Sequence, residues 1–236
     1  MVRLMVLIVS LWLTACSGDP SPVQAPSGQP TRPTRIVSLD YCADQYVLKL
    51  ADRTQILAIS PDAVEDFSYM REKAVGIPTV RPVAEDVLTL KPDLVVRAYG
   101  GGANSVAFFK RAGVPVLQVG WAATVDGEEL GAIPTIIQHM AEGMGQAERG
   151  QALVQDFRAG MNALHARGTG EAALYMTPAF FETLTNHPTA WSPTNHPVAR
   201  AQLEGPHVVP LQGAWTACGG WFILDAIEAL TEGRAE

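Results

Sequence analysis

Residues 84–96, AEDVLTLKPDLVV, predict a short helix that is followed directly by a buried strand. In the first half, Val83, Val87 and Leu90 recur at helical spacing, and two acidic residues occupy the first turn. Pro92 cannot continue the helix, because its nitrogen carries no hydrogen and its ring clashes with the preceding turn. The apolar run LVV that comes next is typical of a parallel strand that is covered on both faces.

The same alternation of strand and helix runs through the first half of the chain. Strands are predicted at 35–39, 56–60, 94–96 and 114–119. Asp40 is a candidate N-cap for a helix over 41–53, and Asn104 is a candidate N-cap for a helix that ends at Gly113. Strands that alternate with helices predict an α/β fold with a mostly parallel sheet.

Helical character replaces strand character from Val125 to Arg167. Residues 151–167 predict a helix about 25 Å long. Its apolar face is formed by Leu153, Phe157, Met161 and Leu164. Strands return at 172–177 and 207–211, and a last helix covers 222–230. The sequence therefore predicts two α/β lobes that are joined by one long helix.

Composition limits the class of protein. The chain has 236 residues, of which 47% are hydrophobic and 17% charged, as in a globular protein of one or two domains. Its formal net charge is −7, and no run of Lys and Arg interrupts it. Nucleic acid is therefore not an expected partner.

The first residues have the pattern of a targeting segment. Arg3 precedes an apolar run, Leu4 to Leu13, that is too short to span a hydrocarbon core of roughly 30 Å. Residues 1–15 are expected to be a secretory signal, and LTAC at 13–16 resembles a bacterial lipobox in which Cys16 carries the lipid. An ordinary signal peptide with a chance cysteine is the alternative. The proline-rich residues 16–34 predict a solvated tether.

Four segments carry a family resemblance. They are RIVSLDYCADQYVLKLADRTQILAIS (35–60), AEDVLTLKPDLVV (84–96), FFKRAGVPVLQVG (108–120) and GAWTACGGWFILDAIEAL (213–230). In this order, behind a lipobox, they resemble the substrate-binding proteins of ABC importers for cobalamin, haem and iron-siderophores. The resemblance implies two Rossmann-like lobes joined by a long helix, no enzymatic activity, and an ABC permease with its ATPase as partners in the periplasm or cell envelope.

The resemblance also divides the chain. The expected parts are a signal peptide (1–15), a lipidated tether (16–34), an N-terminal lobe (35–120), a helical linker (121–169) and a shortened C-terminal lobe (170–236). The cargo would be a corrinoid, haem or ferric siderophore, held between the lobes, and no intrinsic cofactor or metal is expected.

The expected binding site lies beyond the carboxyl ends of the strands, where open parallel sheets bind ligands. The candidate ligand-binding residues are Asp40, Tyr41, Ser60, Tyr99, Trp121, Phe180, Phe181 and Trp215. Flat, rigid rings suit a corrinoid, a porphyrin or a catecholate chelate. Tyr41 and Tyr99 are also candidate ligands of haem iron. The alternative for each aromatic residue is that it packs the lobes.

Glu85 is the expected residue for docking to the permease, because the family carries an acidic residue at this point of the motif. Its alternative role is that of an exposed glutamate favoured by the helix dipole. The family normally repeats the motif once in the second lobe, but only FETLTNHPTAW (181–191) stands where the copy is expected. The second lobe is therefore expected to lack a helix, a strand and the second docking acid.

The two cysteines beyond Cys16 have two interpretations. Cys42 and Cys218 fall in different predicted lobes, and in an oxidising compartment they are candidates for a disulfide. Two buried free thiols are the alternative.

Two further patterns are weaker. TNHP occurs at 185–188 and 194–197, so that His187, His196 and the nearby His207 are candidate zinc ligands, although no acid stands at a recognisable ligand spacing. The loop at 100–105, GGGANS, follows a strand but lacks the third glycine of a dinucleotide site, so close backbone approach or a tight turn explains it better.

The sequence thus predicts a lipid-anchored binding protein that delivers a chelated-metal cofactor to an importer. The alternative is a degenerate envelope lipoprotein that does not transport, and that stores ligand weakly or binds another protein.

Overall fold

Four short parallel strands form the sheet of the protein, in a computed structural model that describes residues 32–98, 100–120, 132–167 and 211–232. The strands are β1 (Ile36–Ser38), β2 (Ile56–Ala58), β3 (Leu94–Arg97) and β4 (Val116–Gln118). Their order is β2-β1-β3-β4, and every neighbouring pair is parallel. The predicted α/β class with a parallel sheet is confirmed.

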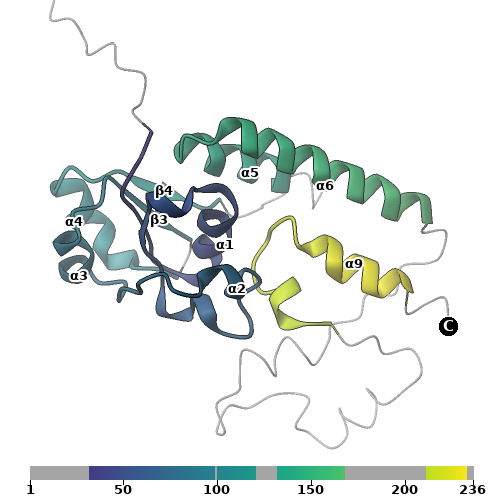
Figure 1. Ribbon diagram of the computed structural model, residues 1–236, viewed down its shortest axis with the longest axis horizontal. Coiled ribbons are helices and arrows are strands. Elements are labelled where there is room, and N and C mark those ends of the chain that lie inside the picture. The colour runs from purple at the N-terminus through teal and green to yellow at the C-terminus, as the bar shows by residue number, and fades with distance from the viewer. Residues whose placement is uncertain (1–31, 99, 121–131, 168–210, 233–236) are drawn as a thin grey trace, which may run out of the picture. The chain divides into compact units, whose positions relative to one another are not determined.

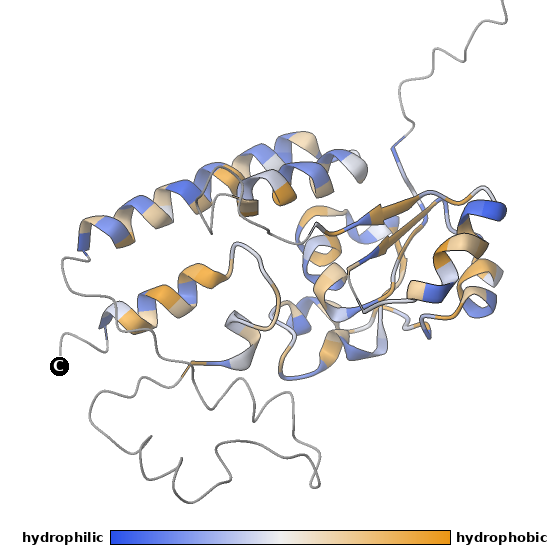
Figure 2. Cartoon of the chain, turned by 180° about the vertical axis from the view of Figure 1, so that it is seen from behind, coloured by the Kyte–Doolittle hydropathy of each residue, from blue (hydrophilic) through white to orange (hydrophobic). Residues whose placement is uncertain are grey.

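Apolar residues cover both faces of this sheet, as the run at 94–96 predicts. Val37 and Val95 pair across β1 and β3, and on one face they pack with Phe109. Their neighbours Ile36 and Leu94 pair in the same register and belong to a larger core on the other face. Figure 2 shows the strands as mainly hydrophobic, while the helices carry hydrophilic residues along one side.

Helices separate the strands and cover the two faces (Figure 1). They are α1 (Tyr41–Leu50), α2 (Arg71–Ala74), α3 (Ala84–Thr89), α4 (Val106–Arg111), α5 (Ala132–Gly143), α6 (Ala147–Arg167) and α9 (Ile223–Glu232). Short 3₁₀ turns add η1 (Arg53–Gln55), η2 (Pro61–Val64), η3 (Ala103–Ser105) and η5 (Gly213–Trp215). Residues of α3 and α4 join the Val37 face, whereas α1 and α5 join the Ile36 face.

The stretch at 84–96 forms the predicted helix, stop and strand, but the apolar stripe is shorter than predicted. Val87 is fully buried, whereas Val83 is 40% exposed. Val83 is the N-cap of α3 and has an extended backbone, so its side chain is not part of the helical face. Lys91 then takes a positive φ of 50° between α3 and Pro92, which completes the turn into β3.

The prediction that Asn104 caps the fourth helix is wrong. Asn104 lies inside η3, and α4 begins two residues later at Val106. A 3₁₀ turn, entered through Gly102 at a φ of +56°, supplies the start of the helix in place of a side-chain cap. Gly113 ends the segment at a φ of +73°, as predicted for a C-terminal glycine.

The long predicted helix is α6, and it begins earlier than predicted, at Ala147. Leu153, Phe157 and Leu164 are buried along one side, as the periodicity indicates. α6 packs on both α5 and α9. Gly150 allows close approach of α5, because a Cβ at this position would overlap the Cβ of Ala141.

The last predicted helix is α9, which begins at Ile223 directly after the buried Phe222. Apart from Leu211, the strands predicted at 172–177 and 207–211 lie outside the described residues. Of the helices that the structure describes, none has the length and apolar character needed to cross a membrane.

Candidate functional site

The loops that follow β1 and β3 meet at the carboxyl edge of the sheet, and Asp40 joins them. One carboxylate oxygen, Oδ1, accepts the backbone N–H of Ala43 at 2.9 Å and caps α1, as predicted. The other, Oδ2, accepts the N–H groups of Ala98 at 2.7 Å and Gly101 at 3.0 Å. Both oxygens are occupied by backbone donors and the residue is buried, so Asp40 has a structural role here: it links the start of α1 to the loop after β3.

Ser60, at the end of the β2 segment, also points inward. Its hydroxyl donates to Asp44 Oδ2 at 2.5 Å, and its N–H donates to Asp44 Oδ1 at 3.3 Å. Asp44 is fully buried in α1, and this burial raises the pKa of its carboxyl from 3.8 to about 7. Ser60 therefore fixes the β2 loop to α1.

Tyr41 is the described first-lobe candidate whose side chain remains partly open. It is half-buried and its ring meets Phe67 edge-on, with 4.9 Å between centroids. Burial raises the pKa of its phenol, and the carboxylates of Asp40 and Asp62 raise it further. Tyr41 is thus held as a neutral phenol, which suits a ring contact or a hydrogen bond.

Trp215 belongs to a cavity of about 300 Å³ that lies between the segment after β2 and η5. The cavity is lined by Tyr69, Met70, Arg71, Glu72, Lys73, Gln212, Ala214 and Trp215. It combines two aromatic rings with two cations and one acid. Its volume falls at the lower end of the range for small-ligand pockets.

Sequence reasoning missed the first wall of this cavity, Tyr69 to Lys73. The place of this segment in the sequence could have identified it as part of the site. SYMREK (68–73) follows the second strand and so belongs to the carboxyl edge. The segment carries a tyrosine and three charged residues there.

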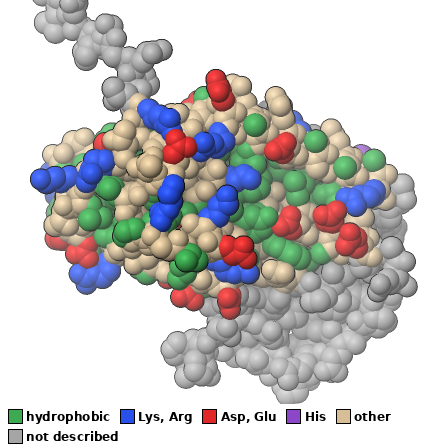
Figure 3. Space-filling view, in the orientation of Figure 1, with side chains coloured by type: hydrophobic (Ala, Val, Ile, Leu, Met, Phe, Trp, Pro, Cys, Tyr) green, Lys and Arg blue, Asp and Glu red, His purple; other side chains and the backbone are tan. Residues whose placement is uncertain are grey.

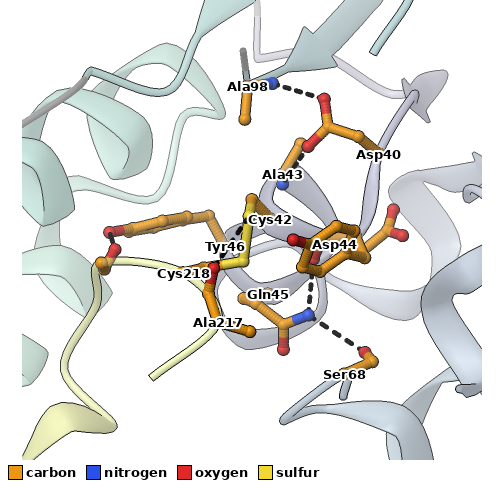
Figure 4. The surroundings of a disulfide bond; sticks show 12 residues. Asp40, Cys42, Ala43, Asp44, Gln45, Tyr46, Ser68, Ala98, Ala217 and Cys218 are labelled. Carbon is orange, nitrogen blue, oxygen red and sulfur yellow. Dashed lines mark hydrogen bonds between the residues drawn. A yellow bond between two sulfur atoms is a disulfide. The ribbon is translucent and has the colours of Figure 1, made fainter. Parts of the chain in front are cut away.

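A disulfide joins α1 to the segment that follows η5 (Figure 4). Cys42, in the first turn of α1, is bonded to Cys218, three residues after Trp215, with 5.5 Å between their Cα atoms. Two tyrosines add hydrogen bonds across the same junction. Tyr46 donates to the carbonyl of Gly219 at 2.8 Å, and Tyr69 donates to Asp225 at 2.8 Å.

Aromatic packing surrounds these bonds. Tyr69 stacks on Phe222 at 4.7 Å between centroids, and Trp221 meets Tyr46 edge-on at 5.4 Å. Burial, and then the Asp225 carboxylate, raise the pKa of Tyr69 to about 12. Tyr69 therefore stays a hydrogen-bond donor at ordinary pH and holds α9 against the cavity wall.

The remaining candidates divide into exposed and undescribed residues. Glu85 is exposed in the first turn of α3. Cys16, Tyr99, Trp121, Phe180, Phe181, His187, His196 and His207 lie outside the described residues. Among the residues that are described, no group of three or more His, Cys, Asp or Glu side chains could hold a metal ion.

A second hollow, of about 550 Å³, lies between α5 and α6. Polar side chains such as His139, Glu142 and Arg158 line it. It contains none of the predicted site residues.

Comparison with known proteins shows the fold. No protein-family model matches the sequence, and no curated protein matches it either. The periplasmic vitamin B12 binding protein BtuF of Vibrio cholerae is 18% identical, with a TM-score of 0.58 over 86% of this chain and 98% of BtuF. The siderophore binding protein BauB, solved with two molecules of acinetobactin and ferric iron, is 12% identical, with a TM-score of 0.60 over 86% of this chain and 93% of BauB.

Other solved structures are matched only in part. The chain spans 47% of a periplasmic haem-binding protein from Pseudomonas aeruginosa, at 21% identity and a TM-score of 0.46 over 57% of this chain. It spans 51% of the haem-binding protein RhuT from Roseiflexus sp. RS-1, at 25% identity and a TM-score of 0.45 over 58% of this chain. The matched part of the chain thus spans about half the length of each of these two structures.

The two structures that the chain matches over most of their length are thus a vitamin B12 binding protein and a siderophore binding protein. The predicted resemblance to binding proteins for vitamin B12 and siderophores is confirmed at the level of the fold, a mixed α/β chain with a parallel sheet.

Proposed function

We propose that this protein is the substrate-binding component of an ABC importer, and that it captures a chelated-metal cofactor and delivers it to a permease. The observation that carries the proposal is the fold likeness over 86% of the chain to a vitamin B12 binding protein and to a siderophore binding protein. The cargo class is therefore a corrinoid, a haem or a ferric siderophore.

The chemistry of the cavity beside η5 supports such a cargo. Trp215 and Tyr69 offer flat surfaces for a conjugated ring system, while Arg71 and Lys73 can pair with its carboxylate, phosphate or phenolate oxygens. Tyr41 adds a neutral phenol at the same carboxyl edge. These side chains bind and orient, and no bond in the cargo is made or broken.

Capture is proposed to involve little hinge motion. The Cys42–Cys218 bond and the Tyr46 and Tyr69 hydrogen bonds hold the η5 wall to the first lobe. α6 packs on α9 behind them. A wall held in this way favours a preformed site over a wide clamp, so that cargo binding needs little reorganisation.

The proposal includes a place in the cell. Lipidation at Cys16 would keep the protein at the membrane in the periplasm, and the exposed Glu85 would contact the permease, which works with its ATPase. A carboxylate in the first turn of a helix is accessible to a basic pocket of a partner.

A thermal melt with a panel of ligands tests the function. The chain from residue 16, with Cys16→Ser to prevent lipidation, is heated alone and with cyanocobalamin, haemin and several ferric siderophores. A ligand at 100 times its Kd should stabilise the folded protein by about 2.7 kcal/mol. Tryptophan fluorescence then gives the affinity for the ligand that shifts the melt.

Two variants place the ligand. Trp215→Ala should weaken binding at least about tenfold, because a stacking ring is lost. Phe108→Ala removes an aromatic ring that is 46% exposed on α4 and lines no part of the cavity, so it should leave affinity unchanged. A sharp melt that no ligand moves would contradict transport and would favour a degenerate, non-transporting envelope lipoprotein.

A further inference from the structure

Cations gather at the amino-terminal edge of the sheet, where strands begin and α1 ends. This basic edge consists of Arg32, Arg35, Lys49, Arg53, Lys91 and Arg149. Figure 3 shows Lys and Arg side chains spread over the part of the surface that carries α1. The chain as a whole has a formal charge of −7, so this local excess of cations is opposite in sign to the net charge of the protein.

Contacts between these residues make the edge continuous. Arg32 and Arg149 both pair with Asp52, which follows α1. Arg35 donates from Nε to the carbonyl of Lys91 at 2.8 Å. Arg53 donates to the carbonyl of Gly76 at 2.7 Å. The guanidinium groups are thus oriented by backbone and by one shared carboxylate, and all six cationic residues remain exposed.

The acids of the basic edge include Asp52, Asp93, Glu142 and Glu148. The two arginines hold the pKa of Asp52 below its usual range. Asp93 is exposed, and it accepts from the N–H and hydroxyl of Thr34 and from the N–H of Arg35. Six cations therefore face four acids, of which Asp52 and Asp93 are already engaged.

At the opposite edge of the sheet, exposed acids outnumber the cations, which include Arg71 and Lys73 of the cavity wall. Asp62, Glu65 and Asp66 are exposed just beyond the carboxyl end of β2, and Glu85 is exposed in the first turn of α3. This separation is supported by the end of α1, which carries Lys49 in its last turn. Its consequence is a charge dipole that runs along the strands, from a basic edge to an acidic edge that also bears the candidate site.

The basic edge includes the residue at which the expected tether joins the fold. Arg32 follows roughly 15 tether residues after Cys16, which span about 45 Å at about 3.1 Å each when extended. A tether of this length keeps the local concentration of the protein at the membrane high, so even a weak attraction holds the edge against it. The tether alone does not orient the protein, whereas the dipole does.

We propose that the basic edge docks on the anionic phospholipid headgroups of the membrane that anchors Cys16. The carboxyl edge and the cavity beside η5 are then directed away from the lipid. This is the resting orientation, and the basic edge must leave the lipid when Glu85 contacts the permease. The docking depends on charge and on the tether, and it does not depend on which cargo binds.

Vesicle binding tests the proposal with the chain from residue 16 carrying Cys16→Ser. At low salt it should co-sediment with vesicles that contain phosphatidylglycerol and not with pure phosphatidylcholine vesicles, and added salt should release it. Arg53→Glu with Lys91→Glu should lower the partitioning at least about tenfold, and it spares Lys49, whose ammonium lies over the Trp221 ring. Arg158→Glu with Arg167→Glu makes the same change in net charge on α6 and should lower it much less.

Lysine acetylation followed by mass spectrometry tests the orientation. On anionic vesicles Lys49 and Lys91 should lose reactivity, whereas Lys73 in the cavity wall should keep it. Absence of binding to anionic vesicles would overturn the proposal, as would equal loss with the two double variants. Protection of Lys49 and Lys91 by inorganic phosphate alone would also overturn it, because the edge would then be a site for a free phosphate.

Discussion

Gly101 is placed where a side chain cannot fit. A Cβ on Gly101 would lie 2.9 Å from the carbonyl carbon of Leu39 and would overlap the Asp40 carboxylate. Its N–H also donates to that carboxylate. This glycine therefore permits the close approach of the loops after β1 and β3, which is one of the two explanations that the sequence favours for GGGANS.

Gly101→Ala should destabilise the protein by about 1 to 3 kcal/mol, because the Asp40 bridge must move to admit the methyl group. Gly100→Ala is the matched control, since a Cβ there meets nothing within 4 Å. It should change the free energy of unfolding by less than about 0.5 kcal/mol. Urea unfolding of the two variants distinguishes them, and equal stabilities would contradict the close-approach explanation.

The buried carboxyl of Asp44 should make stability depend on pH. Its pKa rises from 3.8 to about 7 on folding, so between these values the folded state binds the proton more tightly than the unfolded state. Stability should therefore fall as pH rises through this window and level off above about pH 7. Asp44→Asn removes the ionisation and keeps an acceptor for Ser60.

At pH 8 Asp44→Asn should be more stable than the natural protein by on the order of 1 to 3 kcal/mol, and at pH 4 the two should be similar. The buried hydroxyl of Ser38 interacts with the Asp44 carboxyl and can bond to the amide in its place. Denaturant melts at several pH values measure the slope. Asp62→Asn, at an exposed position, serves as the control, and an unchanged slope in Asp44→Asn would refute the assignment.

At the scale of elements, the sequence predicted those helices and strands whose apolar pattern is uninterrupted, spans several turns or is accompanied by a capping residue. β3 has an uninterrupted apolar run, α1 has an N-cap at Asp40, and α6 repeats its apolar residues over 21 positions. Each signal is local and has a direct physical cause. The start of α4 was not predictable in this way, because a 3₁₀ turn replaces the side-chain cap that Asn104 suggested.

The candidate site was less predictable than the fold. η2 and α2 are four residues each, too short to show a helical period, yet the segment that contains α2 forms one wall of the cavity. Asp40 and Ser60 have the position expected of ligand-binding residues. In the structure Asp40 bonds to backbone N–H groups and Ser60 bonds to Asp44. A polar side chain at a strand end can stabilise the neighbouring loops as well as bind a ligand, and position in the sequence does not distinguish the two roles.

At the scale of the whole molecule, the Cys42–Cys218 bond joins segments that are 176 residues apart in the sequence. Closing a loop of this length restricts the unfolded chain strongly, so the bond is expected to add about 2 to 5 kcal/mol to stability. The segment 211–232 otherwise depends on its contacts with α1, α6 and the Tyr69 loop.

Reduction of the natural protein should therefore lower the unfolding midpoint and also weaken cargo binding, because the η5 wall loses its covalent tie to α1. Cys42→Ser with Cys218→Ser should show both effects without reductant and should not respond to it. Mass spectrometry after alkylation without reduction checks the premise, and labelling of both cysteines would disprove it. If reduction lowers stability but leaves affinity unchanged, the hydrogen bonds of Tyr46 and Tyr69 are sufficient to hold the wall, and Tyr69→Phe in the reduced protein should then release it.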